Sequence, residues 1–215
     1  MTVLLFANGD LDEIEWIRPY LASATAVIAA DGGTNHLWRL GYLPDTVVGD
    51  MDSLSQQAKQ WLLAADIPLL QAPVDKDETD LELALLHAAA KYNEEILIFA
   101  AFGGRLDQTL ANILLLAHPS LADIHIELLT PNERAWLTTA DSEIRGEVGD
   151  TVSLIPLGGD VWVRQTRGLQ WPLENEWLTF GPARGVSNTL SAPVASVSIT
   201  SGTLLCLFTR RSWQR

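Results

Sequence analysis

The sequence contains one cysteine, Cys206, and no apolar run as long as the ~18 residues that a membrane-spanning helix needs. A single cysteine excludes a disulfide within the chain and a zinc site built from several cysteines. The first apolar segment, residues 2–7, has no basic residue before it and no cleavage pattern after it, so we interpret it as structure rather than as a signal peptide. These features predict a protein of the reducing cytoplasm without a membrane partner.

Positive charge is also scarce. The chain has 14 lysines and arginines against 27 aspartates and glutamates, which gives a formal net charge of -13. A field of this sign repels nucleic acid and anionic membranes, so we expect neither as a partner. It would repel a polyphosphate as well. A nucleotide site in this chain therefore requires a bound metal ion or a few well-placed cationic side chains.

Several widespread active-site motifs are missing. The chain has no Gly-x-x-x-x-Gly-Lys-Ser/Thr, no Gly-x-Gly-x-x-Gly and no His-Glu-x-x-His. Their absence argues against a P-loop, a dinucleotide-binding fingerprint and a helical zinc-protease motif. The four histidines are scattered along the chain, and we expect them to be structural or exposed.

Up to about residue 130, short apolar runs alternate with stretches of helical periodicity. The expected strands are Val3–Ala7, Ala26–Ala30, Thr46–Val48, Pro68–Gln71, Ile96–Ala101 and Ile124–Leu128. The expected helices are Leu11–Leu21, Asn35–Leu40, Leu54–Ala65, Asp80–Lys91 and Gln108–Ala117. The segments 53–56 and 79–82 both match the capping box that starts a helix. Such alternation predicts an α/β fold, with a mostly parallel sheet covered by helices on both faces.

After about Pro131 the helical periodicity ends, and short apolar segments alternate with glycine-containing turns. The expected strands are Ala135–Thr139, Thr151–Pro156, Val161–Gln165, Trp177–Phe180, Ala195–Thr200 and Thr203–Phe208. The expected turns include Gly158-Gly159-Asp160 and Ser201-Gly202. This pattern is typical of an antiparallel β-sandwich. We therefore predict two domains, an α/β domain over residues 1–131 and a β-sandwich domain over residues 132–215.

Aspartates stand where the expected strands of the α/β domain end. Asp31 ends the second strand, Asp50 and Asp52 follow the third, and Asp107 follows the fifth, while Asp80 begins a helix. In a parallel α/β sheet all strand-to-helix junctions lie at the carboxyl edge, where ligands bind. We therefore expect these carboxylates to converge at this edge.

Converging carboxylates need a cation. Two carboxylates ~4 Å apart repel each other by about 4 kcal/mol at an effective dielectric constant of roughly 20. Hard oxygen ligands favour Mg²⁺, which commonly binds one or two carboxylates, water and substrate phosphates. The pattern predicts a magnesium–polyphosphate site. In this site Asp50 and Asp52 share one side if their segment is extended, because they are two residues apart.

Each acid alone also has an ordinary structural explanation. Asp80 can oppose the dipole of its helix, and Asp107 can cap the helix that follows it. Asp75 and Asp77 can be solvated loop charges. What favours the functional interpretation is the position of the Asp-x-Asp pair after an apolar strand, in the company of Asp31.

Two glycine pairs precede expected helices. Gly32-Gly33 and Gly103-Gly104 can adopt positive φ and present backbone N–H groups to a phosphate, although either pair can be an ordinary strand-to-helix turn. Arg105 is the leading candidate for a phosphate contact, because its planar fork matches phosphate oxygens. Lys76 is a weaker candidate, and we expect it to be solvated.

The motifs occur in the order Asp31-Gly32-Gly33, Gly49-Asp50-Met51-Asp52-Ser53, Asp75-Lys76-Asp77-Glu78-Thr79-Asp80 and Gly103-Gly104-Arg105-Leu106-Asp107-Gln108. With Pro44 before the second motif, this order and spacing resemble bacterial thiamine pyrophosphokinase. A fifth segment, Arg184-Gly185-Val186-Ser187-Asn188-Thr189, is similar to the Ser-Asn motif of that family's thiamine-binding domain. The resemblance therefore spans nearly the whole chain.

The resemblance implies transfer of the pyrophosphoryl group of ATP to the hydroxyl group of thiamine, which gives AMP and thiamine diphosphate. It implies a homodimer, in which thiamine lies where the α/β domain of one subunit meets the sandwich of the other. The implied Mg²⁺ ligands are Asp31, Asp50, Asp52 and Asp80. The expected ATP contacts are Asp31, Gly32, Gly33, Gly103, Gly104 and Arg105, and the expected catalytic residues are Asp50, Asp52, Asp80 and Asp107. The expected thiamine contacts are Asp107, Gln108, Ser187 and Asn188.

One position departs from the family, because many bacterial members have histidine where this chain has Gln108. We therefore assign Gln108 no role as an acid or a base. Two other functions share parts of the pattern. The Asp-x-Asp pair also occurs in haloacid-dehalogenase-type phosphatases and some glycosyltransferases, but those phosphatases need a later acidic pair and a lysine that we cannot place here. A non-catalytic sensor of thiamine or nucleotide would rarely need so many carboxylates.

Overall fold

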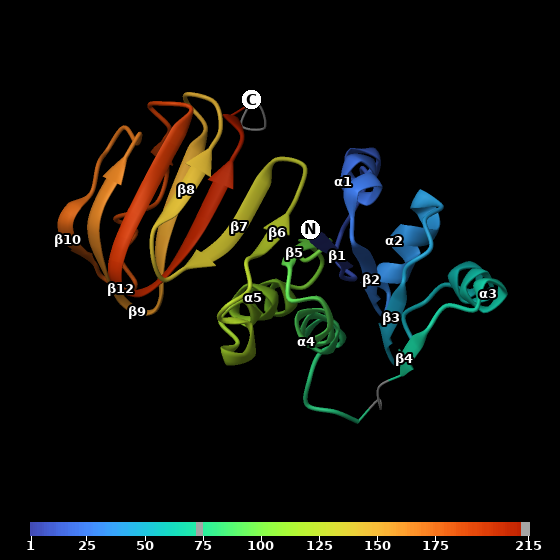
Figure 1. The fold of residues 1–215 in the computed structure, drawn as a ribbon. Helices are drawn as coiled ribbons and strands as arrows, with labels where there is room; N and C mark the ends of the chain where they lie inside the picture. Colours follow the sequence, from blue (N-terminus) through green and yellow to red (C-terminus); the bar gives the residue numbers. More distant parts are fainter. Residues whose placement is uncertain (72–74, 212–215) are drawn as a thin grey trace. The chain divides into compact units, whose positions relative to one another are not determined.

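The computed structural model describes residues 1–71 and 75–211. The chain divides into two compact units, Met1–Leu129 and Thr130–Arg215 (Figure 1). The first unit ends at Leu129, whereas the sequence pattern places the boundary at residue 131. Among the described residues, no helix combines the length and the apolar character needed to span a membrane.

The described strands of the first unit lie side by side in the order β6-β5-β1-β2-β3-β4. Every pairing between these strands is parallel, which confirms the predicted α/β fold. The strands are β1 (Thr2–Phe6), β2 (Ala26–Ala30), β3 (Thr46–Gly49), β4 (Leu69–Gln71), β5 (Glu95–Phe99) and β6 (Ile126–Leu129). The central strands β1, β2 and β5 are apolar except for Thr2 and Glu95 at their amino ends, because both faces of the sheet are covered.

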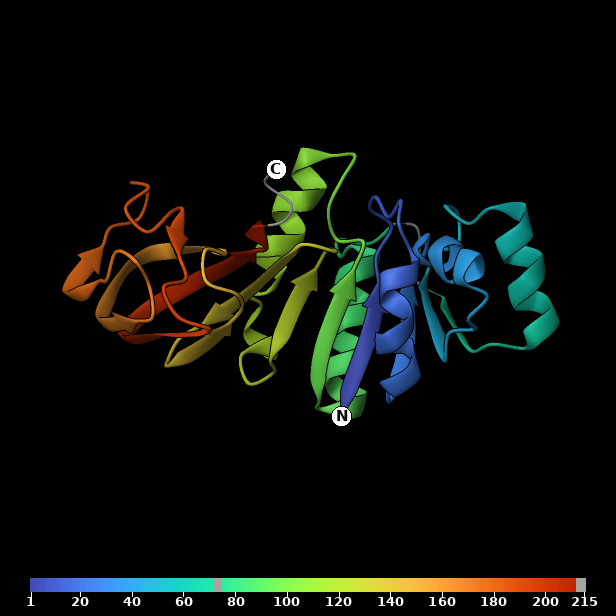
Figure 2. The same cartoon turned by 90° about the horizontal axis from the view of Figure 1, so that it is seen from above.

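Successive side chains of β1 point to opposite faces of the sheet. Leu4 and Phe6 belong to a core cluster shared with Ile17, Leu21 and Leu37 of the helical segments on one face. The other face is covered by α4, which contacts β1, β2 and β3. Figure 2 shows these helices on the two sides of the strands. Burial on both faces makes β1 a rigid support for the loop that follows it.

The helices of this unit are α1 (Arg18–Ser23), α2 (Gly33–Leu40), α3 (Gln56–Ala65), α4 (Asp80–Tyr92) and α5 (Leu106–Leu115). The cap predicted for α4 is confirmed, because Thr79 Oγ1 accepts a hydrogen bond from the N–H of Glu82 (3.2 Å). The start predicted for α3 at Leu54 is wrong. The helix begins two residues later, where Ser55 Oγ accepts from the N–H of Ala58 (3.1 Å).

The first predicted helix, Leu11–Leu21, is also wrong in its bounds. Only a 3₁₀ turn, Glu15–Ile17, and the short α1 form in this region. Pro19 explains the late start of α1, since proline is favoured in the first turn of a helix and excluded from its interior.

The second unit contains β7 (Glu133–Thr138), β8 (Ser142–Arg145), β9 (Thr151–Arg167), β10 (Glu174–Leu178), β11 (Asn188–Thr189) and β12 (Val194–Thr209). The pairings between the described strands of this unit are antiparallel. The sequence pattern divided β9 and β12 into two strands each, and this prediction is wrong. Both strands continue through the glycine segments, with Gly158 at φ 76° and Gly202 at φ 86°. Glycine permits these conformations, and register shifts in β12 accommodate the bend.

The bent strands build two layers. The first half of β12 pairs with β8 and with the end of β9, whereas its second half pairs with β7 and with the start of β9. Side chains from both halves, including Val163, Val197, Leu154 and Phe208, belong to one core cluster. This arrangement confirms the predicted β-sandwich.

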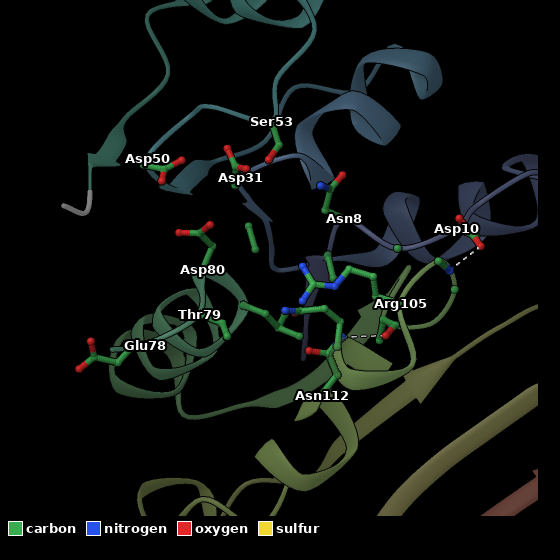
Figure 3. Close-up of a pocket in the computed structure, with 18 of the residues that line it drawn as sticks. Asn8, Asp10, Asp31, Asp50, Ser53, Glu78, Thr79, Asp80, Arg105 and Asn112 are labelled. Atoms are coloured by element: carbon green, nitrogen blue, oxygen red, sulfur yellow. Dashed lines mark hydrogen bonds between the residues drawn. The ribbon is translucent and has the colours of Figure 1, made fainter. Parts of the chain in front are cut away.

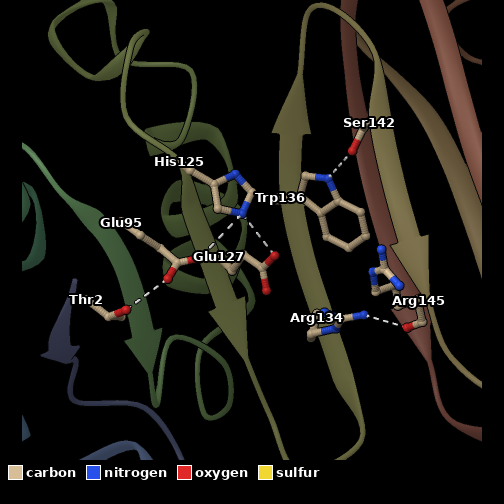
Figure 4. A network of polar contacts seen from close by, with 8 residues as sticks. All are labelled: Thr2, Glu95, His125, Glu127, Arg134, Trp136, Ser142 and Arg145. Carbon is tan, nitrogen blue, oxygen red and sulfur yellow. Dashed lines mark hydrogen bonds and ion pairs between the residues drawn. The ribbon is translucent and has the colours of Figure 1, made fainter. Parts of the chain in front are cut away.

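Side-chain hydrogen bonds join strands in each unit (Figure 4). In the first unit Thr2 Oγ1 donates to Glu95 Oε2 (3.0 Å), and His125 Nε2 lies 3.0 Å from Glu127 Oε1. In the second unit Trp136 Nε1 donates to Ser142 Oγ (3.1 Å). The first group lies at the amino ends of β1, β5 and β6, which is the edge opposite to the carboxyl ends of the strands.

Cys206 lies in the sandwich core with no exposed surface. Burial raises the pKa of its thiol to about 12, so that only about 10⁻⁴ of it is thiolate at pH 8. We expect native protein to react with Ellman's reagent no faster than it unfolds, and one equivalent of thiol to appear when guanidinium is added. Rapid reaction of one equivalent in the native protein would contradict the buried position of Cys206.

Candidate functional site

A cavity of about 580 Å³ opens at the carboxyl edge of the parallel sheet in the first unit. Its lining comes from the loops after β1, β2, β3 and β5 and from the first turns of α4 and α5. The strand order reverses between β1 and β5, so the cavity lies at the topological switch point where doubly wound folds bind ligands. Figure 3 shows carboxylates from separate segments around it.

Asp31 directly follows β2 and is only 4% exposed. Its backbone has φ 40°, a left-handed conformation that aspartate tolerates better than most residues. Its Oδ1 atom is buried and has no hydrogen-bond partner among the described residues. Burial and the neighbouring carboxylates of Asp80 and Asp50 raise the pKa of Asp31. A buried carboxylate of this kind is costly unless a cation joins it.

Asp50 and Asp52 are brought together by a turn. Their segment is not extended, which was the condition under which we expected them to share one side. Met51 has φ 67°, and Asp50 Oδ1 accepts a hydrogen bond from the N–H of Asp52 (3.0 Å). One carboxylate oxygen from each of Asp31, Asp50 and Asp52 lies within 4.8 Å of the others. Asp52 is the exposed member of this group and does not line the cavity.

Asp80 approaches the same group from the first turn of α4. A Cβ atom added to Gly49 would lie 2.9 Å from Asp31 Cβ and 3.0 Å from Asp80 Oδ1, so these two side chains flank one point above Gly49. Lys76 Nζ donates to Asp80 Oδ1 (2.7 Å), and only 11% of the Lys76 side chain is exposed. The prediction that Lys76 is solvated is therefore wrong.

The acidic residues fit a hard divalent cation. They supply carboxylate oxygens only, which is the donor set that Mg²⁺ prefers. Among the described residues Asp31 Oδ1 is a buried acceptor without a hydrogen-bond partner, and a cation would satisfy it. The geometry therefore agrees with a metal site at this edge of the sheet.

The two glycine pairs differ. Gly103 and Gly104 have φ 103° and 68°, and both line the cavity. Gly32 has φ -58° and caps α2, and neither it nor Gly33 is part of the lining. A Cβ atom on Gly33 would lie 2.0 Å from the carbonyl oxygen of Phe6, so this glycine allows α2 to approach β1.

Arg105 lines the cavity, but its guanidinium group is paired with Asp107. Arg105 Nε lies 3.1 Å from Asp107 Oδ1, and Nη2 lies 2.5 Å from Oδ2. Both side chains are largely exposed. The hydrogen bond from Arg105 lowers the pKa of Asp107. Gln108 lines the cavity and Asp107 does not.

The two predicted thiamine contacts of the second unit differ in solvent exposure. Ser187 is exposed, whereas Asn188 is 6% exposed. The side chain of Asn188 accepts from the N–H of Trp171 (3.1 Å) and donates to its carbonyl oxygen (2.6 Å). Asn188 therefore holds the backbone of Trp171, whose side chain is 52% exposed.

The loop after β1 was missed by the sequence analysis. Asn8, Gly9 and Asp10 all line the cavity. The N–H of Gly9 donates to the carbonyl oxygen of Ala100 (2.7 Å), and Asp10 Oδ2 accepts from the N–H of Gly104 (3.0 Å). The position of Asn8-Gly9-Asp10 directly after an apolar strand was the available signal, since Asp31 occupies the same position after the next strand.

The fold and the cavity define an α/β protein with a carboxylate-rich ligand site at the switch point of its sheet. Two family models match this chain: the catalytic domain of thiamin pyrophosphokinase over residues 17–128, and the vitamin B1 binding domain of thiamin pyrophosphokinase over residues 141–204. The chain belongs to the thiamin pyrophosphokinase family.

Individual relatives agree with this assignment. Thiamine pyrophosphokinase of Bacillus subtilis is 31% identical over 208 residues, which cover 96% of this chain and 97% of the relative. Its crystal structure matches with a TM-score of 0.89 over 98% of this chain and all of that one. The crystal structure of thiamin pyrophosphokinase from Geobacillus thermodenitrificans has a TM-score of 0.87 at 27% identity, with 99% of each chain covered.

Proposed function

We propose that this chain transfers the pyrophosphoryl group of ATP to the hydroxyl group of thiamine, giving thiamine diphosphate and AMP. Membership of the family supports this activity. The observation that carries the proposal in the structure is the convergence of Asp31, Asp50, Asp52 and Asp80 at the switch point of the sheet. A phosphatase or a non-catalytic sensor has no comparable support.

We infer that these four aspartates hold Mg²⁺. When bound there, Mg²⁺ neutralises charge on the polyphosphate and orients it. The aspartates themselves come from three separate segments, and the fold fixes their distances before any ligand arrives. Phosphoryl transfer depends mainly on such positioning and on charge neutralisation.

The loop of Gly103 and Gly104 and the start of α5 form the proposed phosphate-binding side of the cavity. Positive φ at both glycines turns the backbone sharply, and the amino end of α5, which favours an anion, follows directly. Arg105 is the proposed cationic contact. The Nε–Nη2 side of its fork is engaged with Asp107, so a phosphate can be bound through Nη1, or through the Nε–Nη2 side if Arg105 leaves Asp107.

The thiamine hydroxyl group must lose a proton, and Asp80 and Asp107 are the proposed acceptors. The ion pair with Arg105 lowers the pKa of Asp107 and so weakens it as a base. Movement of Arg105 onto a phosphate would restore the basicity of Asp107. Full turnover by folded Asp107→Asn protein would remove Asp107 from this role.

Gln108, Ser187 and Asn188 remain proposed thiamine contacts. Since both ends of the Asn188 side chain bind the backbone of Trp171, we propose that Asn188 acts by holding this segment. A homodimer with thiamine near the subunit interface, and a cytoplasmic location, also remain predictions. Light scattering after size-exclusion chromatography tests the dimer.

The function is tested by incubating the purified chain with thiamine, ATP and Mg²⁺ and identifying the products by chromatography. We expect AMP and thiamine diphosphate in equal amounts. ADP and thiamine monophosphate would instead indicate a simple kinase. Absence of nucleotide conversion by folded protein would contradict the proposal and direct attention to phosphatase substrates.

A further inference from the structure

Lys76 stands out because it is a largely buried cation inside an acidic cavity. Among the described residues, it is the only lysine or arginine that forms an ion pair with one of the four clustered aspartates. Its Nζ atom lies 2.7 Å from Asp80 Oδ1, with 11% of the lysine side chain and 27% of the aspartate side chain exposed. The pairing therefore takes place largely away from water.

The position of Lys76 is not a consequence of helix geometry. Lys76 and Asp80 are four residues apart, but α4 begins only at Asp80, so the lysine lies in the loop before the helix. This loop turns the ammonium group back onto the first turn of α4 and into the cavity lining. The tertiary fold thus places a positive charge against the acidic cluster.

The ammonium group also acts on the other acids. The hydrogen bond to Asp80 raises the pKa of Lys76, and the carboxylates of Asp80, Asp50 and Asp31 add to this effect. Lys76 therefore stays charged and offsets part of the repulsion in the cluster. Arg105, the other cationic side chain of the lining, is paired with Asp107.

An ammonium group and a divalent cation compete for the same oxygen. Lysine is a compact point charge with donors only, so it neutralises a carboxylate but cannot bridge several of them. A metal ion bound at Asp80 Oδ1 would lie beside the ammonium group, and repulsion between the two cations favours displacement of the ammonium group. A displaced ammonium group beside the cluster needs a new anionic partner, which free metal does not bring and a polyphosphate does.

We propose that Lys76 is an internal counter-cation that makes the site select the metal–nucleotide complex over the free metal ion. It holds Asp80 while the site is empty, opposes binding of free metal, and passes to polyphosphate oxygens when metal and nucleotide enter together. This inference rests on the proposed function, since it assumes that the four aspartates bind metal with ATP.

The test measures Mn²⁺ binding to the full chain by electron paramagnetic resonance, with and without α,β-methylene-ATP, which cannot transfer its pyrophosphoryl group. Without nucleotide, we expect Lys76→Met to bind Mn²⁺ on the order of tenfold more tightly than wild type. With the analogue, we expect the variant to bind the metal–nucleotide complex on the order of tenfold more weakly. Lys59→Met is the matched control, because it removes the same charge from an exposed position on α3.

Circular dichroism establishes whether each variant is folded, and Lys76→Gln replaces Lys76→Met if the latter is not. Wild-type affinity for Mn²⁺ in the folded Lys76 variant, or an equal change in Lys59→Met, would overturn the inference. Mn²⁺ binding to Asp50→Asn distinguishes failure of the inference about Lys76 from failure of the proposed function. If wild type binds Mn²⁺ and Asp50→Asn does not, the metal site stands and only the role of Lys76 is lost. If wild type does not bind Mn²⁺ with or without the analogue, both proposals fail.

Discussion

We expect Asp50→Asn to lower kcat/KM for pyrophosphoryl transfer by on the order of 10³-fold, because removal of one proposed metal ligand costs several kcal/mol of transition-state stabilisation. Asparagine is the informative substitution here. Its Oδ1 atom can still accept the hydrogen bond that Asp50 Oδ1 receives from the N–H of Asp52, so the turn is preserved. Steady-state assays that detect AMP measure the effect.

The same substitution has the opposite effect on stability. Asp50 repels Asp31 and Asp52, whose carboxylate oxygens lie within 4.8 Å of its own. We therefore expect the free energy of unfolding in EDTA to rise by about 1 kcal/mol in Asp50→Asn, after allowance for solvent screening. Urea denaturation measures it. A misfolded variant would lose activity and stability together, so the two readouts distinguish loss of a ligand from loss of the fold.

Asp123→Asn is the matched control for both measurements, because Asp123 is exposed and does not line the cavity. We expect its kcat/KM and its unfolding free energy to equal those of wild type. Retention of wild-type activity by folded Asp50→Asn would contradict the proposed metal site.

Gly33→Ala destabilises the first unit by about 3 kcal/mol, since the added methyl group overlaps fixed backbone. The new Cβ atom would lie 2.0 Å from the carbonyl oxygen of Phe6 and 2.6 Å from its carbonyl carbon. Phe6 belongs to β1 at the centre of the sheet, so α2 must move instead. Asp31, two residues before Gly33, would move with it and reduce activity as well. Urea denaturation followed by tryptophan fluorescence measures the loss.

Gly159→Ala is the control for Gly33→Ala. Within the described part of the chain, no heavy atom lies within 4 Å of a Cβ atom at Gly159, and its φ is outside the left-handed region. We expect its unfolding free energy to stay within about 0.5 kcal/mol of wild type. If Gly33→Ala instead kept full stability and raised only the KM for ATP, Gly33 would be a nucleotide contact, as the sequence pattern predicted, and not a packing residue.

The strands and the acidic cluster could be predicted from the sequence for one reason. In a parallel α/β sheet, the residue that follows a strand is also the residue at the ligand-binding edge. The positions of Asp31 and Asp50 relative to their strands therefore predicted their meeting without knowledge of any contact. The bounds of the long strands β9 and β12 could not be predicted in the same way, because glycine at 158 and 202 permits both a turn and a bent, continuous strand.

By itself, the sequence determined the α/β and β-sandwich units, the family and the aspartates of the proposed metal site, since each depends on local order along the chain. Only the tertiary structure decided what those groups contact. Asp10 binds the N–H of Gly104 across 94 positions, and Asn188 binds Trp171 across 17. The tertiary fold also decided that the side chain of Lys76 is largely covered and paired with Asp80 rather than solvated. Such pairings depend on how separate segments pack. This packing cannot be predicted from hydrophobic periodicity or from motif spacing.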